Sequence, residues 1–250
     1  MSYQEYGERR RLEREQKELF RRTYAEECRA LEQKGFMRRG GLVVPDPAKQ
    51  VAVLMIPGFG SKAQDFFPIK ESLDKTFGRS LASYVVPAGG YFTNSQTAER
   101  MVASRMQEVV CAHPHLEVLI TLPYSYGGRV AASAFSAVSS SVECVQISLA
   151  TPYADHKLES LEQFPDLMQL TAYSPAVQEW PVVRFPSDVL VEAYYSNNDG
   201  IVQETDIGWV PNMTVQRIGG LHHKDFMRAR KIVPYLVRDP ILNQAAKELS

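Results

Sequence analysis

Apolar positions follow a helical period near the start of the chain and a strand-like pattern later. Over residues 4–34 the apolar side chains recur at spacings of three, four or seven, which predicts one helix with an apolar stripe. The stripe consists of Leu12, Leu19, Phe20, Tyr24, Cys28 and Leu31. The stretch contains no Pro and is rich in Glu, Arg, Lys and Gln, which favour helices. Gly35 and then Gly40 and Gly41 predict its end.

From Gln50 onward, short and nearly continuous apolar runs alternate with helical patterns. The predicted strands cover residues 51–56, 80–87, 116–122, 142–149, 189–195 and 213–218. The predicted helices cover residues 65–75, 97–112, 127–138 and 223–236. Apolar strands that alternate with helices are typical of a parallel sheet covered on both faces. We therefore predict an α/β fold, with a mostly parallel, doubly wound sheet and an extra N-terminal helix.

Composition and charge narrow the class of protein. The 250 residues carry 28 basic and 29 acidic side chains, a net charge of −1, so we expect no nucleic-acid partner. The longest apolar stretch, from Val51 to Phe59, is far shorter than the ~20 residues of a membrane span. The first fifteen residues lack the apolar core of a secretory signal. Three widely separated cysteines argue for a reducing compartment, so we expect a cytoplasmic protein with neither disulfides nor a cysteine-based metal site.

The first 40 residues are expected to form a helical arm, and residues 41–250 a single α/β domain. Residues 1–39 hold 11 basic and 8 acidic side chains, so this arm carries +3 and the remainder −4. The favoured interpretation is that the apolar stripe packs on the domain or on a second copy of the chain. The alternative is a basic helix lying on a membrane surface, against which the interspersed Glu residues count.

The strand predicted at 116–122 runs into Pro123-Tyr-Ser-Tyr-Gly-Gly128 and then into a helix of small residues. A strand, a sharp turn and a helix would present Ser125 at the carboxyl edge of the sheet, as a nucleophile requires. The backbone N–H of Tyr126 would then point at a developing oxyanion. The alternative is an ordinary turn with a capping serine. The segment Ser125-Tyr-Gly-Gly-Arg-Val-Ala131 resembles the nucleophile region of α/β-hydrolases, although Pro123 stands where Gly-x-Ser-x-Gly has its first glycine.

A second segment of the same resemblance follows the first predicted strand. Residues 57–61 read Pro-Gly-Phe-Gly-Ser, similar to the His-Gly-Phe-Gly loop of α/β-hydrolases, with Pro57 in place of the histidine. The resemblance implies that the N–H of Phe59 is the second oxyanion donor, beside that of Tyr126. The alternative is a phosphate-binding turn, but neither nucleotide-binding glycine motif is present.

The last two strands supply an acid and a base. Asp199 follows the strand at 189–195 within an Asn-Asn-Asp-Gly turn, and His222 and His223 follow the strand at 213–218. In the α/β-hydrolase family these are the places of the acid that orients the histidine and of the histidine itself. His223-Lys-Asp-Phe resembles the His-x-Asp-Phe of lipase-type members, which favours His223 over His222. The order Ser125, Asp199, His223 is that of the family.

This resemblance implies a serine hydrolase, similar to lipases and carboxylesterases, that acts on a small-molecule or lipid ester through an acyl-enzyme. It implies no metal and no organic cofactor, and a short cap at about residues 150–187. Two alternatives stay open. One is a non-catalytic scaffold of the same fold, and the other is an acyltransferase or a peptidase.

Overall fold

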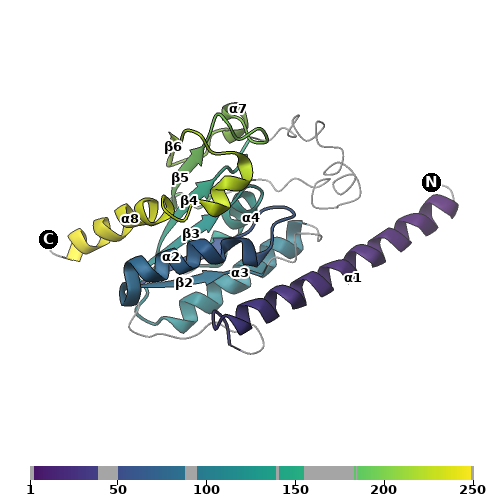
Figure 1. Ribbon diagram of the computed structural model, residues 1–250, viewed down its shortest axis with the longest axis horizontal. Coiled ribbons are helices and arrows are strands. Elements are labelled where there is room, and N and C mark those ends of the chain that lie inside the picture. Colours follow the sequence, from purple (N-terminus) through teal and green to yellow (C-terminus); the bar gives the residue numbers. More distant parts are fainter. Residues whose placement is uncertain are drawn as a thin grey trace.

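The computed structural model describes residues 3–38, 50–87, 95–138, 141–154, 183 and 185–248. Within these residues six strands form one sheet in the order β2-β1-β3-β4-β5-β6, and every neighbouring pair is parallel (Figure 1). The strands are β1 (Val51–Ile56), β2 (Leu81–Val85), β3 (Val118–Pro123), β4 (Glu143–Leu149), β5 (Leu190–Tyr195) and β6 (Met213–Arg217). The predicted parallel α/β sheet is confirmed.

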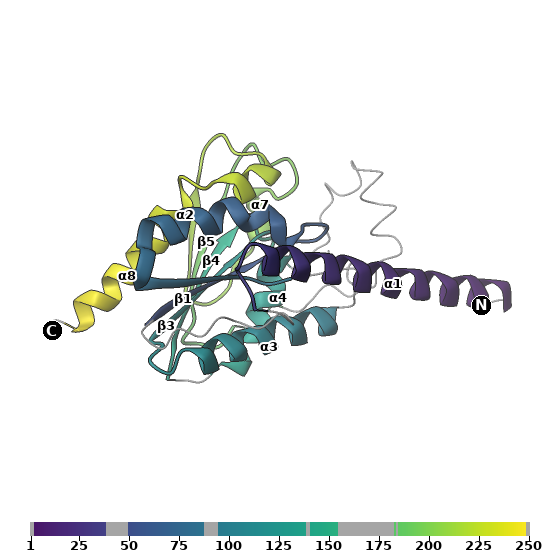
Figure 2. The same cartoon turned by 60° about the horizontal axis from the view of Figure 1, so that its bottom comes forward.

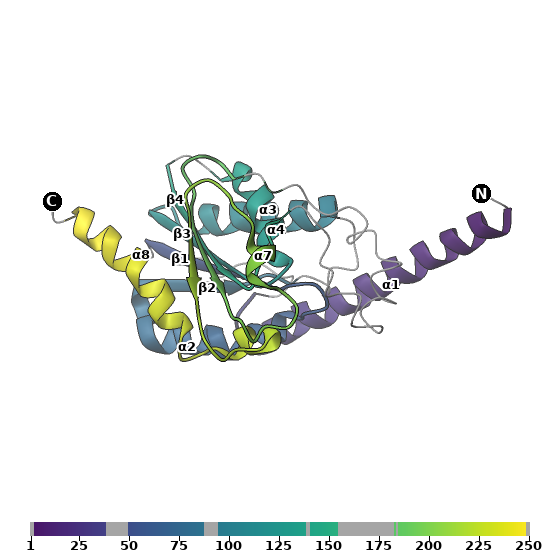
Figure 3. The same ribbon diagram turned by 90° about the horizontal axis from the view of Figure 1, so that it is seen from above.

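Helices cover both faces of this sheet. The α-helices are α1 (Tyr3–Gln33), α2 (Phe67–Phe77), α3 (Ser95–Ala112), α4 (Gly127–Ala134), α7 (Glu204–Ile207) and α8 (Val233–Glu248). Short 3₁₀ segments are η1 (Ala63–Phe66), η2 (Gly78–Ser80), η4 (Phe135–Ala137) and η6 (His223–Arg228). Figure 3 shows α3 and α4 on one side of the sheet and α2 on the other.

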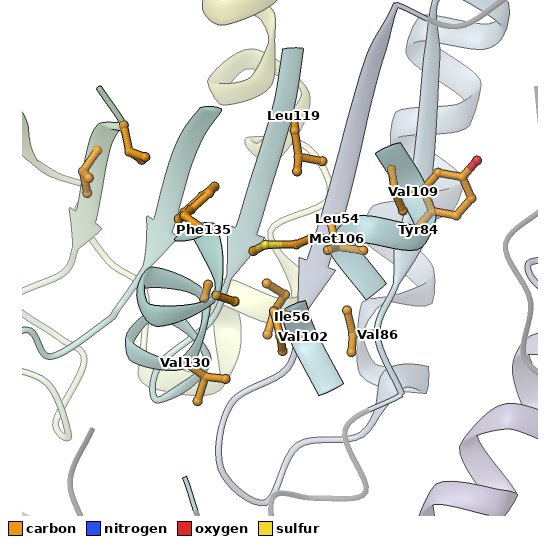
Figure 4. Close-up of a cluster of buried hydrophobic side chains, with 14 of the residues drawn as sticks. Leu54, Ile56, Tyr84, Val86, Val102, Met106, Val109, Leu119, Val130 and Phe135 are labelled. Atoms are coloured by element: carbon orange, nitrogen blue, oxygen red, sulfur yellow. The ribbon is translucent and has the colours of Figure 1, made fainter. Parts of the chain in front are cut away.

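Alternate residues of the interior strand β1 enter two separate cores. Leu54 and Ile56 point to the face covered by α3 and α4, where Val102 and Met106 pack against the sheet (Figure 4). Val51, Val53 and Met55 contribute to the opposite core, which also contains side chains of α2 and α8. A strand buried on both faces needs the continuous apolar run from which this strand was predicted.

The strand order reverses at β1, because β2 lies on one side of it and β3 on the other. In open parallel sheets the crevice at such a reversal, beyond the carboxyl ends of the strands, is where ligands bind. The segments that follow β1 and β3 hold Phe59 and Ser125. The topology therefore brings the two predicted motifs to one crevice.

The C-terminal helix differs from the prediction. We expected one helix over residues 223–236, but the structure has the 3₁₀ segment η6 followed by a separate helix α8. The backbone of Ala229 has a ψ of 40°, which is outside the helical range, so the helical conformation is interrupted between η6 and α8. Pro234 can begin a new helix because its missing N–H falls in the first turn, where no intrahelical partner exists.

Helix α1 confirms the N-terminal helix, and Gly35, with a φ of +71°, follows its end. Figure 2 shows its C-terminal end against the body and the rest of the helix extending away from it. Leu31 is fully buried in the core that contains Phe66 and Ile69, while Leu19 and Phe20 are only half-buried. The inner end of the apolar stripe thus packs on the domain. The predicted cap at 150–187 lies mostly outside the described residues.

Candidate active site

A sharp turn joins β3 to α4 and carries Ser125 at its tip. Ser125 adopts the left-handed region with a φ of +52°, which is strained for a residue with a side chain. Its N–H donates to the carbonyl of Leu149 on β4 at 2.8 Å, and its own carbonyl accepts from Gly128 at 3.0 Å. These bonds hold the strained turn in place. Ser125 is only partly buried.

The small residues around this turn are required by close approach of the loop after β1. A Cβ added to Gly127 would lie 2.6 Å from the carbonyl oxygen of Pro57, and one added to Gly58 would lie 2.8 Å from that of Tyr124. Both distances are too short for any side chain. The two glycines therefore allow the Ser125 turn and the Phe59 loop to pack directly on each other.

The predicted oxyanion donors lie on these two packed segments. Gly60 has a φ of +71°, and the N–H of Ser61 donates to the carbonyl of Gly58 at 3.1 Å, so the loop turns tightly around Phe59. The rings of Phe59 and Tyr126 meet edge to face with their centroids 6.4 Å apart. The backbones of both predicted donors are thus held next to Ser125.

Asp199 and His223 complete a chain of hydrogen bonds that ends at the serine. Nδ1 of His223 lies 2.8 and 2.9 Å from the two carboxylate oxygens of Asp199, and its Nε2 lies 3.0 Å from Oγ of Ser125. The backbone also joins the pair, because the N–H of His223 donates to the carbonyl of Asp199 at 3.2 Å. The structure therefore brings Ser125, Asp199 and His223 together, whereas His222 is exposed.

The Asp199 carboxylate is oriented by its own turn. Its Oδ1 accepts hydrogen bonds from the backbone N–H groups of Ile201 and Val202 at 3.0 and 2.6 Å. The residue is only 4% exposed. A buried carboxylate needs such donors, and here they fix the carboxylate with both of its oxygens facing Nδ1 of the imidazole.

Tyr124 is a site residue that the sequence did not reveal. It is buried, and its ring packs on the imidazole of His223 with a centroid distance of 4.8 Å. Burial first, and then the negative charge of Asp199, raise the pKa of the Tyr124 phenol above its ordinary value. The phenol therefore stays neutral, and its ring packs against one side of the histidine. The only signal in the sequence for a role of Tyr124 at the site is its position next to Ser125.

The two prolines that depart from the family pattern are accommodated by the backbone. The β3–β4 ladder ends with the pairing of Thr121 and Gln146 and resumes as a single bridge between Tyr124 and Leu149. Pro123 falls in this gap, where its missing N–H removes a ladder bond. Pro57 presents its carbonyl to Gly127, as described above. Neither proline separates the serine from its neighbours.

The described residues contain no group of three His, Cys, Asp or Glu side chains that is arranged to hold a metal ion. Cys28, Cys111 and Cys144 are all free thiols. None of the helices that the structure describes combines the length and the apolar character needed to cross a membrane.

Solved structures with the same architecture show which fold this is, although no protein-family model and no curated protein matches the sequence. The mature lipase BlEst2 of Bacillus licheniformis is similar at a TM-score of 0.59 and 17% identity, over 79% of this chain and 94% of that one. The metagenomic carboxyl esterase MGS0156 is similar at 0.57 and 12%, over 81% and 80%. MGS-MChE2, an alpha/beta hydrolase enzyme from lagoon sediments, is similar at 0.53 and 13%, over 78% and 92%. The chain has the α/β-hydrolase fold.

Proposed function

We propose that this protein is a serine hydrolase that cleaves carboxylic esters, with Ser125 as nucleophile, His223 as general base and Asp199 as the acid that orients it. The observation that carries the proposal is the continuous set of hydrogen bonds from Asp199 through His223 to Ser125. The strain at Ser125 adds to it, because strained residues cluster at functional sites. Similarity in fold to a lipase and to a carboxyl esterase agrees with this chemistry.

The reaction proceeds in two halves. Nε2 of His223 takes the hydroxyl proton as Oγ of Ser125 attacks the ester carbonyl, and Asp199 stabilises the imidazolium that forms. The N–H groups of Phe59 and Tyr126 donate to the oxyanion, and the N-terminus of α4 adds a partial positive charge. The tetrahedral intermediate then expels the alcohol, which receives the proton from His223. Water, activated by the same histidine, releases the acyl group as a carboxylic acid.

Labelling with a fluorophosphonate probe tests this proposal. We expect a covalent adduct on Ser125, located by mass spectrometry, together with hydrolysis of p-nitrophenyl esters. Ser125→Ala should abolish both while the protein stays folded. Ser136→Ala, at an exposed serine after α4, is the matched control and should retain both. A wild-type protein that is folded but neither labels nor hydrolyses any ester of a chain-length series would favour the non-catalytic scaffold.

The location and the partners of the protein remain predictions. We propose a cytoplasmic protein without metal or organic cofactor, on the basis of its sparse cysteines and of the chemistry above. Self-association, or contact with a membrane surface, would involve the outer part of α1. In that part, Arg10, Arg11, Arg14 and Lys17 are exposed together with Glu15 and Glu18. This mixture of charges favours self-association over membrane binding.

A further inference from the structure

One buried carboxylate is not used by the proposed mechanism. Glu27 lies on α1, outside the sheet and the helices that cover it, and it is 0% exposed. Its Oε1 accepts a hydrogen bond from the backbone N–H of Ala63 at 3.1 Å. Burying a carboxylate is costly unless hydrogen bonds compensate for the lost water. A glutamate at this position therefore calls for a reason beyond packing.

The partner of Glu27 belongs to the loop that carries a proposed oxyanion donor. Ala63 follows Phe59 by four residues and begins η1. The loop is anchored at its first end, where Gly58 packs on the Ser125 turn. At its second end, Ala63 is fully buried and bonded to Glu27. The loop that contains Phe59 is thus held at both ends, by the Ser125 turn at Gly58 and by Glu27 of α1 at Ala63.

Local bonds stiffen the segment between these anchors. The N–H of Ser61 donates to the carbonyl of Gly58, and the N–H of Lys62 donates to the carboxylate of Asp65 at 2.8 Å. A displacement of Ala63 would therefore shift Phe59 as well, because the bonded residues between them cannot easily change conformation to compensate.

The packing of α1 supports the same contact. Leu31 lies one turn after Glu27, on the same face of the helix, and is fully buried in one core with Ala63 and Phe66. Phe226, from the η6 segment that begins with His223, lies in that core as well. The inner end of α1 therefore packs on η1, and η1 in turn packs on the segment η6 that carries His223.

We infer that Glu27 is a positioning residue, which holds the Ala63 amide so that the N–H of Phe59 points at the oxyanion. The inference rests on the proposed hydrolase function, because the oxyanion exists only in that reaction. Loss of one complete oxyanion donor lowers kcat by about 10²–10³. A donor that is misdirected rather than lost should cost less, on the order of 10- to 100-fold in kcat with KM nearly unchanged.

Three substitutions at Glu27 and one at its exposed neighbour test the inference. Glu27→Ala removes the acceptor, and Glu27→Asp shortens its reach by one methylene, so both should lower kcat. Glu27→Gln keeps an oxygen that can accept from Ala63 and should recover most of the activity. Glu26→Ala, one residue earlier and exposed, is the matched control and should behave as wild type. If Glu27→Ala does not fold, Glu27→Asp and Glu27→Gln still provide the comparison.

Hydrogen exchange of the full-length protein supplies a readout that needs no substrate. Backbone amides of residues 57–66 should exchange faster in Glu27→Asp than in wild type, and near the wild-type rate in Glu27→Gln. If Glu27→Asp lowers the melting temperature but leaves kcat and this exchange unchanged, Glu27 is only structural and the inference is wrong. An inactive wild type would instead refute the proposed function, and the exchange would still decide whether Glu27 holds the loop.

Discussion

Replacing Asp199 with asparagine changes one atom of the site and should reverse one hydrogen bond. Two backbone N–H groups, of Ile201 and Val202, point at Oδ1 of Asp199 at 3.0 and 2.6 Å. An asparagine must therefore place its carbonyl oxygen at Oδ1 and its NH₂ at Oδ2, so that this NH₂ lies about as close to Nδ1 of His223 as the carbonyl oxygen does and points its hydrogens at it. This amide donates, so Nδ1 must accept and the proton moves to Nε2. Nε2 can then no longer take the proton of Ser125.

The expected loss follows from this wrong tautomer. In serine hydrolases such a change lowers kcat by about 10⁴, which corresponds to about 5.5 kcal/mol of transition-state stabilisation. Because asparagine nearly matches aspartate in shape, the fold should persist. The assay is kcat for a p-nitrophenyl ester, with the rate of fluorophosphonate labelling measured in parallel and the melting temperature as the check on folding.

Asp225→Asn is the matched control for this experiment. Asp225 lies two residues after His223, and its Oδ2 accepts the N–H of His222 at 3.0 Å. An asparagine can keep that bond through its carbonyl oxygen, so only the charge is lost and kcat should change little. A loss of less than tenfold in Asp199→Asn would refute the orienting role. Equal losses in both variants would show that negative charge, rather than the tautomer, is what matters.

Three further results are expected. His223→Ala should lower kcat by several orders of magnitude, as removal of a base does, while His222→Ala should lower it only slightly; the reverse would exchange their roles. Gly127→Ala should lower stability by about 1–3 kcal/mol in thermal unfolding, since its Cβ would meet two backbone carbonyls, and an unchanged melting temperature would contradict this. Deletion of residues 1–18 should leave the melting temperature unchanged. Deletion of residues 1–34 should lower it by at least about 5 °C, because buried Leu31 is lost; equal effects would show that α1 acts as one unit.

The sheet could be predicted because its strands are apolar on both faces and end at strong breakers. β1 is buried along its whole length and stops before Pro57-Gly58, as the pattern indicated. The region after His223 was harder to predict. The periodicity of residues 223–236 is compatible with one helix, and only the geometry at Ala229 separates η6 from α8. Such a break depends on tertiary contacts, which cannot be derived from the local pattern of apolar and polar residues.

The residues of the site were predictable to different degrees. Ser125, Asp199 and His223 each follow a strand of a parallel sheet, so their meeting at one edge is a consequence of topology. Tyr124 could not be assigned, because a tyrosine beside a turn has no pattern that distinguishes a packing role. Glu27 was hidden for a different reason. Its contact with Ala63 spans 36 residues, and a glutamate in a helix rich in charges is expected to face water.

The glycines of the proposed oxyanion loop give a reason why the additional helix α1 is attached at this point. Gly58 and Gly60 let the backbone turn around Phe59, but glycine also loses the most conformational freedom when it is fixed. Such a loop keeps one geometry only if its neighbours restrain it. The Ser125 turn restrains one end, and Glu27 supplies a restraint at the other. On this argument the inner half of α1 is part of the folded α/β-hydrolase domain, and only its outer half extends away from it as an arm.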